Sequence, residues 1–391
     1  MMRISKHHGR CSGLSLVELM VAITLGLLLT AGMVQLFNAS KVTFQTNDAI
    51  ARVQENGRFA LETLKLQLRE TGALGFCAGR VEINNHLNAG CVGGLADIFG
   101  ANQALVGWEF SGTGRQATYT LPDDLDPATT SAGDWDSSAD NASLPDALNG
   151  RVVPGSDVLV MRRLLPINGL TGNPSNLTLN VNTCRSSTSI SLDGAHGLAD
   201  NAIVLATNCT TGDLFQNDGT GNSFRRGSGS CAAPGPGNVS GLNWSACYAT
   251  DMQAFAVEQV AFYIGRNGDG QTGLYRFNMS NGVAAGAAEE IIQGAENMQV
   301  LYGYSQAAPT GDGQSVNDWL TASEVPDDGW QQVIAVRLAL SIRSPERADL
   351  DQTDLNFELA QTQVTIPGDG RIRQPFSTTI ALRNRVLVFD N

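Results

Sequence analysis

The chain has 391 residues, of which 42% are hydrophobic and 16% are charged. The hydrophobic fraction is too high for a disordered protein, and a mean hydropathy of −0.08 is too low for a polytopic membrane protein. A net charge of −13 argues against binding to nucleic-acid backbones through bulk charge. These values favour a secreted or periplasmic, loop-rich β or α+β protein.

Charge is distributed unevenly along the chain. Residues 1–13 carry three Lys or Arg and no acid, and the only charge between Arg10 and Lys41 is Glu18. Residues 73–391 hold 17 cations, all of them arginine, against 33 acids. The acidity therefore belongs to the larger, C-terminal part of the chain, where it favours solubility.

An apolar stretch at residues 19–37 is the first predicted element. Its sequence, LMVAITLGLLLTAGMVQLF, is long enough as a helix to cross the hydrocarbon core of a bilayer, which is about 30 Å thick. The positive-inside rule keeps the basic leader in the cytoplasm and sends the rest of the chain outward. A cleaved secretory signal peptide is the alternative, but the stretch is too long for such a signal and no A-x-A-like site follows it.

Glu18 stands at the edge of this apolar segment. A carboxylate costs on the order of 3 kcal/mol at the centre of a bilayer and less near its edge, so it usually has a functional partner. No Lys or Arg lies within one helical turn of Glu18. Cleavage between Gly13 and Leu14 would create an α-amino group four residues before Glu18, in the same chain or in a neighbour.

The segment GLSLVE, from Gly13 to Glu18, resembles the class III signal of type IV prepilins, because it follows a short basic leader and precedes an uncharged apolar stretch. The resemblance implies that a prepilin peptidase cleaves after Gly13 and that the new first residue, Leu14, is N-methylated. It also implies that Glu18 pairs with the N-terminal amine of a neighbouring subunit during assembly. The usual first residue of the mature chain is Phe, so Leu14 departs from the commonest pattern.

A helical pattern continues through residues 38–72, where Gly72 marks the predicted end. Opposite charges recur at helical neighbour distances, as in Asp48/Arg52, Arg58/Glu62 and Glu62/Lys65. Apolar residues form a single stripe: Ile50, Val53, Gly57, Leu61, Leu64 and Leu68. A coiled-coil seam is the alternative, but the stripe is short and contains Gly57, which favours packing against the protein's own sheet. We therefore expect one long helix, with a membrane half at 14–37 and an amphipathic half at 38–72.

Further motifs resemble the PilW family of minor pilins. They are QENGRFA at 54–60, LRETG at 68–72, GFC at 75–77, VIAVRLALSIRS at 333–344 and TTIALRNR at 378–385. The resemblance implies a pilin-like α+β fold, in which the long N-terminal helix packs on an antiparallel β-sheet head with long loops. It also implies partners: other minor and major pilins, prepilin peptidase and an inner-membrane assembly platform.

The rest of the chain, residues 73–391, is predicted to form one periplasmic α+β head with insertions in about 95–250. Residues 111–156 and 207–241 are rich in small polar residues and predict long surface loops. Alternating or apolar runs predict strands at Asp157–Arg163, Ala202–Ala206, Val257–Gly265, Leu274–Phe277, Met298–Tyr304, Gln332–Arg343 and Ser377–Val388.

Six cysteines remain once Cys11 in the leader is set aside, and an even number in an exported chain predicts three disulfides. They are Cys77, Cys91, Cys184, Cys209, Cys231 and Cys247. Spacing does not select among the fifteen possible pairings. We expect sequential pairing (77–91, 184–209, 231–247), because each bond would then link one loop-rich segment. Zinc binding is the alternative, but the chain has no C-x-x-C and no paired Cys/His spacing.

No catalytic constellation is visible. The mature chain has two histidines, His86 and His196, without suitably spaced partners, and neither G-x-S-x-G nor H-E-x-x-H occurs. The G-x-G-x-x-G match at 268–273 precedes a strand-like sequence, so Asn267–Gly273 is predicted to be a hairpin loop rather than a dinucleotide site. We expect no cofactor, metal or small-molecule substrate.

Three acidic clusters could attract calcium, but none has the ligand spacing of a calcium loop, so we expect solvated turns. The clusters are Asp123/Asp124/Asp126, Asp312 with Asn317/Asp318, and Asp349/Asp351/Asp354.

The predicted function is structural. The resemblance implies a minor pilin that helps to initiate or cap a type IV pilus, anchored once in the inner membrane with its head in the periplasm and finally placed near the pilus tip. A minor pseudopilin of type II secretion, similar to GspJ, is the main alternative. A membrane-anchored periplasmic enzyme or an adhesin is a more remote one.

Overall fold

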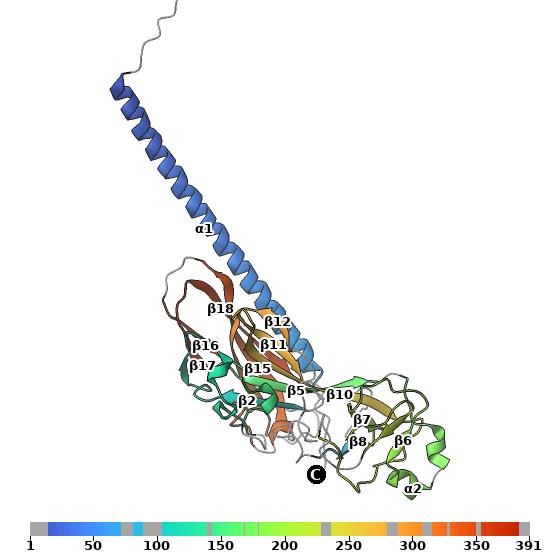
Figure 1. Ribbon diagram of the computed structural model, residues 1–391. Helices are drawn as coiled ribbons and strands as arrows, with labels where there is room; N and C mark the ends of the chain where they lie inside the picture. The colour runs from blue at the N-terminus through green and yellow to red at the C-terminus, as the bar shows by residue number, and fades with distance from the viewer. Residues whose placement is uncertain are drawn as a thin grey trace, which may run out of the picture.

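The computed structural model describes residues 15–71, 81–88, 104–138, 143–167, 169–178, 180–227, 236–279, 288–306, 315–326, 329–348 and 353–382. One long helix leads into a β-rich head, and its C-terminal part lies along that head (Figure 1). This arrangement confirms the α+β class and the long apolar helix at the N-terminus.

The helices are α1 (Leu16–Arg69) and α2 (Val181–Ser186), with short 3₁₀ turns η2 (Pro127–Thr129), η3 (Ala132–Asp134), η4 (Asp146–Leu148), η5 (Pro174–Thr178) and η6 (Gly329–Gln332). The strands are β1 (Glu82–Asn85), β2 (Leu105–Phe110), β3 (Thr118–Thr120), β4 (Trp135–Asp136), β5 (Val158–Pro166), β6 (Ser189–Ser191), β7 (Ile203–Thr207), β8 (Thr211–Gln216), β9 (Ser223–Arg225), β10 (Gln253–Arg266), β11 (Thr272–Asn278), β12 (Glu289–Gln293), β13 (Ala295–Tyr304), β14 (Asp318–Leu320), β15 (Val333–Arg347), β16 (Leu355–Leu359), β17 (Thr362–Ile366) and β18 (Arg371–Ala381).

The helix α1 is continuous and amphipathic only in its second half. Its buried positions are Ala49, Val53, Gly57, Ala60, Leu64 and Leu68. The predicted stripe is therefore confirmed, except that Ala49 and Ala60 are buried in place of their larger neighbours Ile50 and Leu61, which are half-buried. Small alanines at the contact allow the helix axis to approach the sheet. The stripe packs on the protein's own strands β15 and β18, so the coiled-coil alternative is not needed.

Two of the three predicted ion pairs on α1 are present. Arg52 Nε lies 2.9 Å from Asp48 Oδ2, and Lys65 Nζ lies 3.5 Å from Glu62 Oε2. Both pairs are on the surface, where such contacts contribute little to stability. The helix ends at Arg69 with Glu70 as its C-cap. The predicted end at Gly72 lies outside the described residues.

Two main sheets build the head. The larger has nine strands, with the order β1-β8-β7-β10-β5-β2-β4 and with β11 and β12 branching from β10. The smaller has the order β14-β13-β15-β18, and α1 packs against its β15 and β18. Most pairs are antiparallel, as predicted, but β1 pairs with β8 and β17 pairs with β3 in parallel. The head is therefore mainly antiparallel, and these two pairs depart from the expected antiparallel sheet.

The head has two lobes with separate hydrophobic cores (Figure 1). The proximal lobe packs against α1, and its core includes residues of β2, β5, β10, β13 and β15. The distal lobe, formed mainly by the chain between β5 and β10, contains α2 and β6–β9 around Phe215, Phe224 and Trp244. The long strand β10 joins the lobes. Along one of its edges it pairs first with β7 of the distal lobe and then with β11 of the proximal lobe, and its other edge pairs with β5.

All seven predicted strands are present as β5, β7, β10, β11, β13, β15 and β18. The described part of β18 ends at Ala381, and the predicted continuation to Val388 lies beyond the described residues. Residues 267–271 form the turn between β10 and β11, and Thr272 and Gly273 lie in β11 opposite Arg266 and Gly265. This confirms the predicted hairpin and removes the dinucleotide motif.

Candidate functional site

The N-terminal half of α1 extends away from the head (Figure 1). Every residue from Ser15 to Gln45 is exposed, and Leu28 and Phe37 each have 70% of their surface accessible. An 18-residue window in this half has a mean hydropathy of 2.1 and is not buried at all by the head. An apolar surface of this size requires a cover of lipid or protein. The helix is therefore suited to anchor the chain in a membrane.

Glu18 forms a capping box with Ser15 at the start of α1. The Ser15 N–H donates to Glu18 Oε2 at 3.1 Å, and the Glu18 N–H donates to Ser15 Oγ at 3.2 Å. The carboxylate thus accepts a hydrogen bond at the positive end of the helix dipole. Ser15 was missed in the sequence analysis, although the S-x-x-E pattern at 15–18 signals it. Gly13 and Leu14 lie outside the described residues.

Close packing joins the second half of α1 to the head. The Phe376 ring on β18 lies against Gly57, and a Cβ built at position 57 would overlap that ring. The Asn56 side-chain amide donates to the Gln293 carbonyl at the end of β12, at 3.1 Å. Because β18 belongs to the smaller sheet and β12 to the larger one, these contacts hold α1 against both main sheets of the head.

Arg163 on β5 anchors the C-terminal end of α1 where the lobes meet. Its guanidinium donates to Glu258 Oε2 on β10 at 2.5 Å and to Gln67 Oε1 on α1 at 3.3 Å. Glu70, the C-cap of α1, lies 3.8 Å away. A cation at this position also complements the negative end of the helix dipole.

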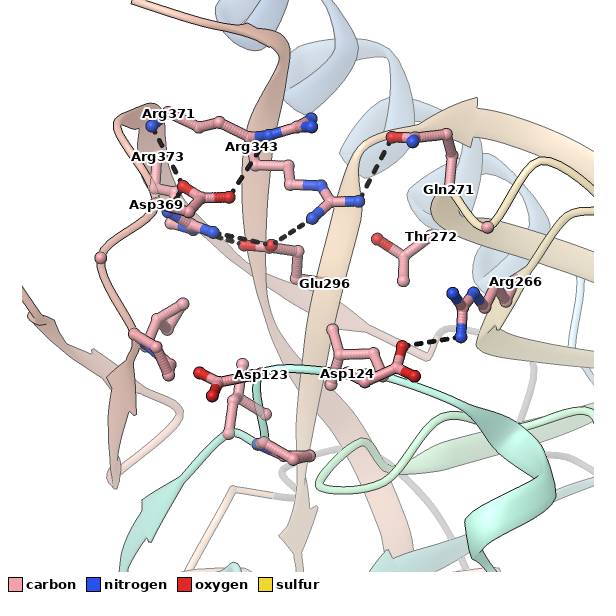
Figure 2. Close-up of a pocket in the computed structure, with 17 residues that line it drawn as sticks. Asp123, Asp124, Arg266, Gln271, Thr272, Glu296, Arg343, Asp369, Arg371 and Arg373 are labelled. Atoms are coloured by element: carbon pink, nitrogen blue, oxygen red, sulfur yellow. Dashed lines mark hydrogen bonds and ion pairs between the residues drawn. The ribbon is translucent and has the colours of Figure 1, made fainter. Parts of the chain in front are cut away.

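A buried ion network lies beneath the helix–head contact (Figure 2). Glu296 on β13 binds Arg373 of β18 at 2.7 Å and Arg343 of β15 at 3.2 Å, and Arg373 also binds Asp369 at 2.6 Å. Burial alone would lower the pKa of Arg373, but its bonds with Glu296 and Asp369 raise it. Burial lowers the pKa of Arg343 despite the nearby Glu296. The network ties three strands of the α1-packed sheet together and forms one side of a pocket.

Two buried carboxylates, Asp157 and Glu109, lie in the proximal core, and Asp157 connects the large and small sheets. Asp157 accepts hydrogen bonds from the backbone N–H of Phe110 on β2 at 3.1 Å and of Val300 on β13 at 2.8 Å. Burial raises the pKa of Asp157 to about 7. Burial, and then the nearby Asp157, raise the pKa of Glu109 well above its ordinary range. These side chains lie inside the proximal core and not in an accessible cleft.

His86 belongs to a buried polar cluster in the distal lobe. Its Nε2 lies 2.6 Å from Asp213 Oδ1, and its Nδ1 lies 3.2 Å from an Arg226 nitrogen. Asp213 also accepts from the Tyr248 hydroxyl at 2.5 Å and the Ser245 hydroxyl at 3.0 Å. Burial, and then Asp213, raise the pKa of Tyr248, which keeps its hydroxyl protonated as a donor. Asp213 stands between His86 and Ser245, so the order is not that of a Ser-His-Asp triad.

The other predicted histidine, His196, has structural contacts. Its Nε2 donates to the Gly219 carbonyl at 3.1 Å, and its Nδ1 accepts from the Leu198 N–H at 3.0 Å. Within the part of the chain that the structure describes, no group of three or more His, Cys, Asp or Glu could hold a metal ion.

The acidic clusters are divided among separate contacts. Asp124 pairs with Arg266 at 2.7 Å, Asp126 caps η2, and Asp318 lies 3.2 Å from Arg115. Asn317 accepts from the Gln306 N–H, and Asp354 accepts from the Gly368 N–H. Asp123 lines the pocket beside the Glu296 network. Asp312, Asp349 and Asp351 lie outside the described residues.

The disulfide pairing differs from the sequential expectation. Cys184 on α2 is bonded to Cys247, with 5.7 Å between their Cα atoms, so the predicted 184–209 and 231–247 pairs are wrong. The reason is the packing of two distant segments: the Trp244 N–H donates to the Arg185 carbonyl, and the Arg185 Nε donates back to the Trp244 carbonyl, both at 2.8 Å. Cys209 is also in a disulfide. Cys77, Cys91 and Cys231 lie outside the described residues, and the 77–91 pair stays a prediction.

Comparison with known proteins gives one match. Residues 261–384, from within β10 to just past β18, match the family model of PilW, the type IV pilus-assembly protein W. The matched segment includes β15 and β18, the strands on which α1 packs. No curated protein and no solved structure matches the chain. The match supports the family resemblance that the motifs carry, over residues 261–384, and with it the involvement of the chain in type IV pilus assembly.

Proposed function

We propose that the protein is a minor pilin that helps to initiate or cap a type IV pilus. Export would place the head in the periplasm, and a prepilin peptidase would remove residues 1–13. The observation that carries the proposal is the first half of α1, which is apolar and exposed and has Glu18 in its first turn. In a filament, this surface would pack among the helices of other minor and major pilins instead of lipid.

Glu18 has the central role in the proposed assembly step. In the single chain its carboxylate is held by the Ser15 N–H. A neighbouring N-terminal amine brings a full positive charge into an apolar environment, where attraction to the carboxylate is much stronger than in water. Pairing of the two would offset the cost of burying each charge alone and would fix the axial position of the incoming subunit.

The proposed site of action is the inner membrane and then the pilus, near its tip. The second half of α1 is fixed to the head by Gly57, Asn56 and Arg163, so extraction of the apolar half from the bilayer would carry the whole head with it. This coupling is structural and requires no catalytic group in the head.

The test is complementation of a deletion strain with processing, piliation and protein secretion measured separately. We expect deletion to reduce surface pili and to leave type II secretion intact. Gly13→Val should leave an unprocessed precursor, visible as a size shift on a gel. Glu18→Ala should be processed normally but should support at least about tenfold fewer pili, because an amine buried without its carboxylate is costly.

The matched control is Glu55→Gln, which changes an exposed acid in the second half of the same helix. It should be processed and should support normal piliation. Wild-type piliation with Glu18→Ala would contradict the assembly step. Loss of secretion without loss of pili would favour the pseudopilin alternative.

A further inference from the structure

A polar pocket in the proximal lobe has no part in the proposed assembly of α1. Its volume is about 410 Å³, within the range of small-molecule sites, about 300–1,000 Å³. Its walls come from residues 121–125, the β10–β11 hairpin, β13, β15 and residues 366–373. Five segments that are far apart in sequence thus converge on one cavity (Figure 2).

Opposite sides of the pocket carry opposite excess charge. One side has an excess of one positive charge, because it holds three arginines and two carboxylates. The arginines are Arg343, Arg371 and Arg373, and the carboxylates are Glu296 and Asp369. Figure 2 shows Asp123 and Asp124 across the cavity from this group, where Arg266 balances only one of the two. The pocket is therefore neutral overall but has a positive and a negative side.

Three buried side-chain atoms in the pocket wall have no hydrogen-bond partner in the described structure. Thr272, the first residue of β11, is only 2% exposed, and its hydroxyl has no partner in the described structure. The Nε atoms of Arg343 and Arg371 are also buried and without a hydrogen-bond partner there, although Arg371 Nε lies 3.3 Å from Asp369 Oδ2. Buried polar groups are nearly always paired, so unpaired ones in the wall of a cavity indicate a polar group that the cavity receives.

The chemistry of the walls excludes several ligand classes. A polyanion such as a phosphate ester would face Asp123 and Asp124, and a simple cation would face the arginines. None of the residues that line the pocket is aromatic, so a sugar ring would have no surface on which to stack its apolar face. A neutral molecule with separated positive and negative ends meets all the conditions.

We propose that this pocket binds a small zwitterion of the amino-acid or short-peptide class. Its carboxylate lies toward Arg343, its ammonium group toward Asp123 and Asp124, and the Thr272 hydroxyl bonds to it between the two ends. The Glu296 network positions the arginines before the ligand arrives, which reduces the entropy lost on binding.

The test is calorimetric titration of the full-length chain in detergent micelles. The probes are glycine, β-alanine, γ-aminobutyrate and diglycine, which vary the distance between the charged ends. Acetate, ethylamine and glucose serve as single-charge and uncharged controls. We expect at least one zwitterion to bind about tenfold more tightly than any control. No binding by any zwitterion at about 10 mM, or equal binding by a control, would overturn the proposal.

Two variants locate the binding in this pocket. Thr272→Val removes the hydroxyl with little change in volume, and Asp123→Asn removes an exposed charge; each should weaken binding about tenfold. The controls are Thr379→Val on the exposed face of β18 and Asp200→Asn in the distal lobe, which should bind as the wild type does. Thermal unfolding of Thr272→Val should be unchanged or improved, since the hydroxyl is unpaired. Unchanged affinity in both pocket variants would place the ligand elsewhere and contradict the proposal.

Discussion

Phe376 on β18 covers Gly57 on α1 so closely that a side chain at position 57 has no room. Glycine lowers helix stability by about 1 kcal/mol relative to alanine in an exposed position, so its presence mid-helix needs a compensating contact. The Phe376 ring supplies that contact. Glycine at position 57 therefore lowers the stability of the isolated helix but allows the helix to pack closely against the head.

The first prediction concerns this contact. Gly57→Ala should lower the stability of the head by about 1–3 kcal/mol through overpacking, despite the better helix propensity of alanine. The measurement is thermal unfolding of the full chain in micelles. Gly32→Ala is the control, because a Cβ at position 32 meets nothing within 4 Å. In a Phe376→Leu background, Gly57→Ala should cost less stability than it does in the wild type. If Gly57→Ala lowers stability equally in both backgrounds, the proposed overlap with Phe376 is contradicted.

The second prediction concerns the cap of α1. Ser15→Ala removes the hydroxyl that accepts the Glu18 N–H and should cost about 1 kcal/mol at the first turn. Amide exchange of residues 16–18 in micelles should become faster, and piliation should fall less than with Glu18→Ala, because the Ser15 N–H still binds the carboxylate. Thr24→Val, which removes a hydroxyl from the same half of the helix without touching the cap, is the control. Identical exchange in the two variants would show that the Ser15 hydroxyl does not stabilise the turn.

The third prediction concerns pH. Asp157 has a pKa of about 7 in the folded protein and an ordinary value near 3.8 when unfolded. Between these values the folded protein holds a proton that the unfolded chain has released, so the free energy of unfolding should fall as pH rises from about 4 to about 7. The slope from one such group is about 1.4 kcal/mol per pH unit, and Glu109 adds to it in the same direction.

Urea unfolding at pH 5, 6, 7 and 8 measures this slope. Asp157→Asn should reduce the loss of stability between pH 5 and 7, even though the amide pairs less well with the N–H groups of Phe110 and Val300. Asp136→Asn, at an exposed carboxylate of β4, should leave the slope unchanged. Parallel curves for the wild type and Asp157→Asn would contradict the assignment.

The fourth prediction concerns the disulfide of the distal lobe. Peptide mapping under non-reducing conditions should find Cys184 linked to Cys247. Replacing both with serine should destabilise the distal lobe by about 2–4 kcal/mol, because the bond closes a loop with a sequence separation of 63 residues. The unfolding of the lobe followed by Trp244 fluorescence provides the measurement. Mapping that found Cys184 linked to Cys209 would contradict the structure.

The sequence predicted those elements whose stability comes from a local pattern. The stripe on α1 has a helical period, and β13 and β15 are apolar runs, so both were visible without knowledge of their partners. The strand β8 was missed because its sequence, TGDLFQ, contains Asp213 and Gln216, which read as loop residues. They are buried because His86, Tyr248 and Asn238 supply their hydrogen bonds from distant segments.

The same distinction applies to the sites. The membrane half of α1 and Glu18 depend on neighbours in sequence and were predicted. The Cys184–Cys247 bond and the polar pocket depend on which segments meet in space, and no spacing of residues along the chain encodes that. The Ser15 cap is the exception, since its four-residue pattern was present and was not used.

The strand β10 passes through both lobes and pairs with β5 along most of its length. Both strands enter the distal lobe at the same end, where Pro166 faces Phe255, so a force that pulls the lobes apart acts on the two strands together and is resisted by the pairing of β5 with β2 and of β10 with β11. Arg163, at the same junction, connects that strand pair to the end of α1. Tension applied to the distal lobe would therefore reach α1 through the backbone of the sheet and not through a flexible linker.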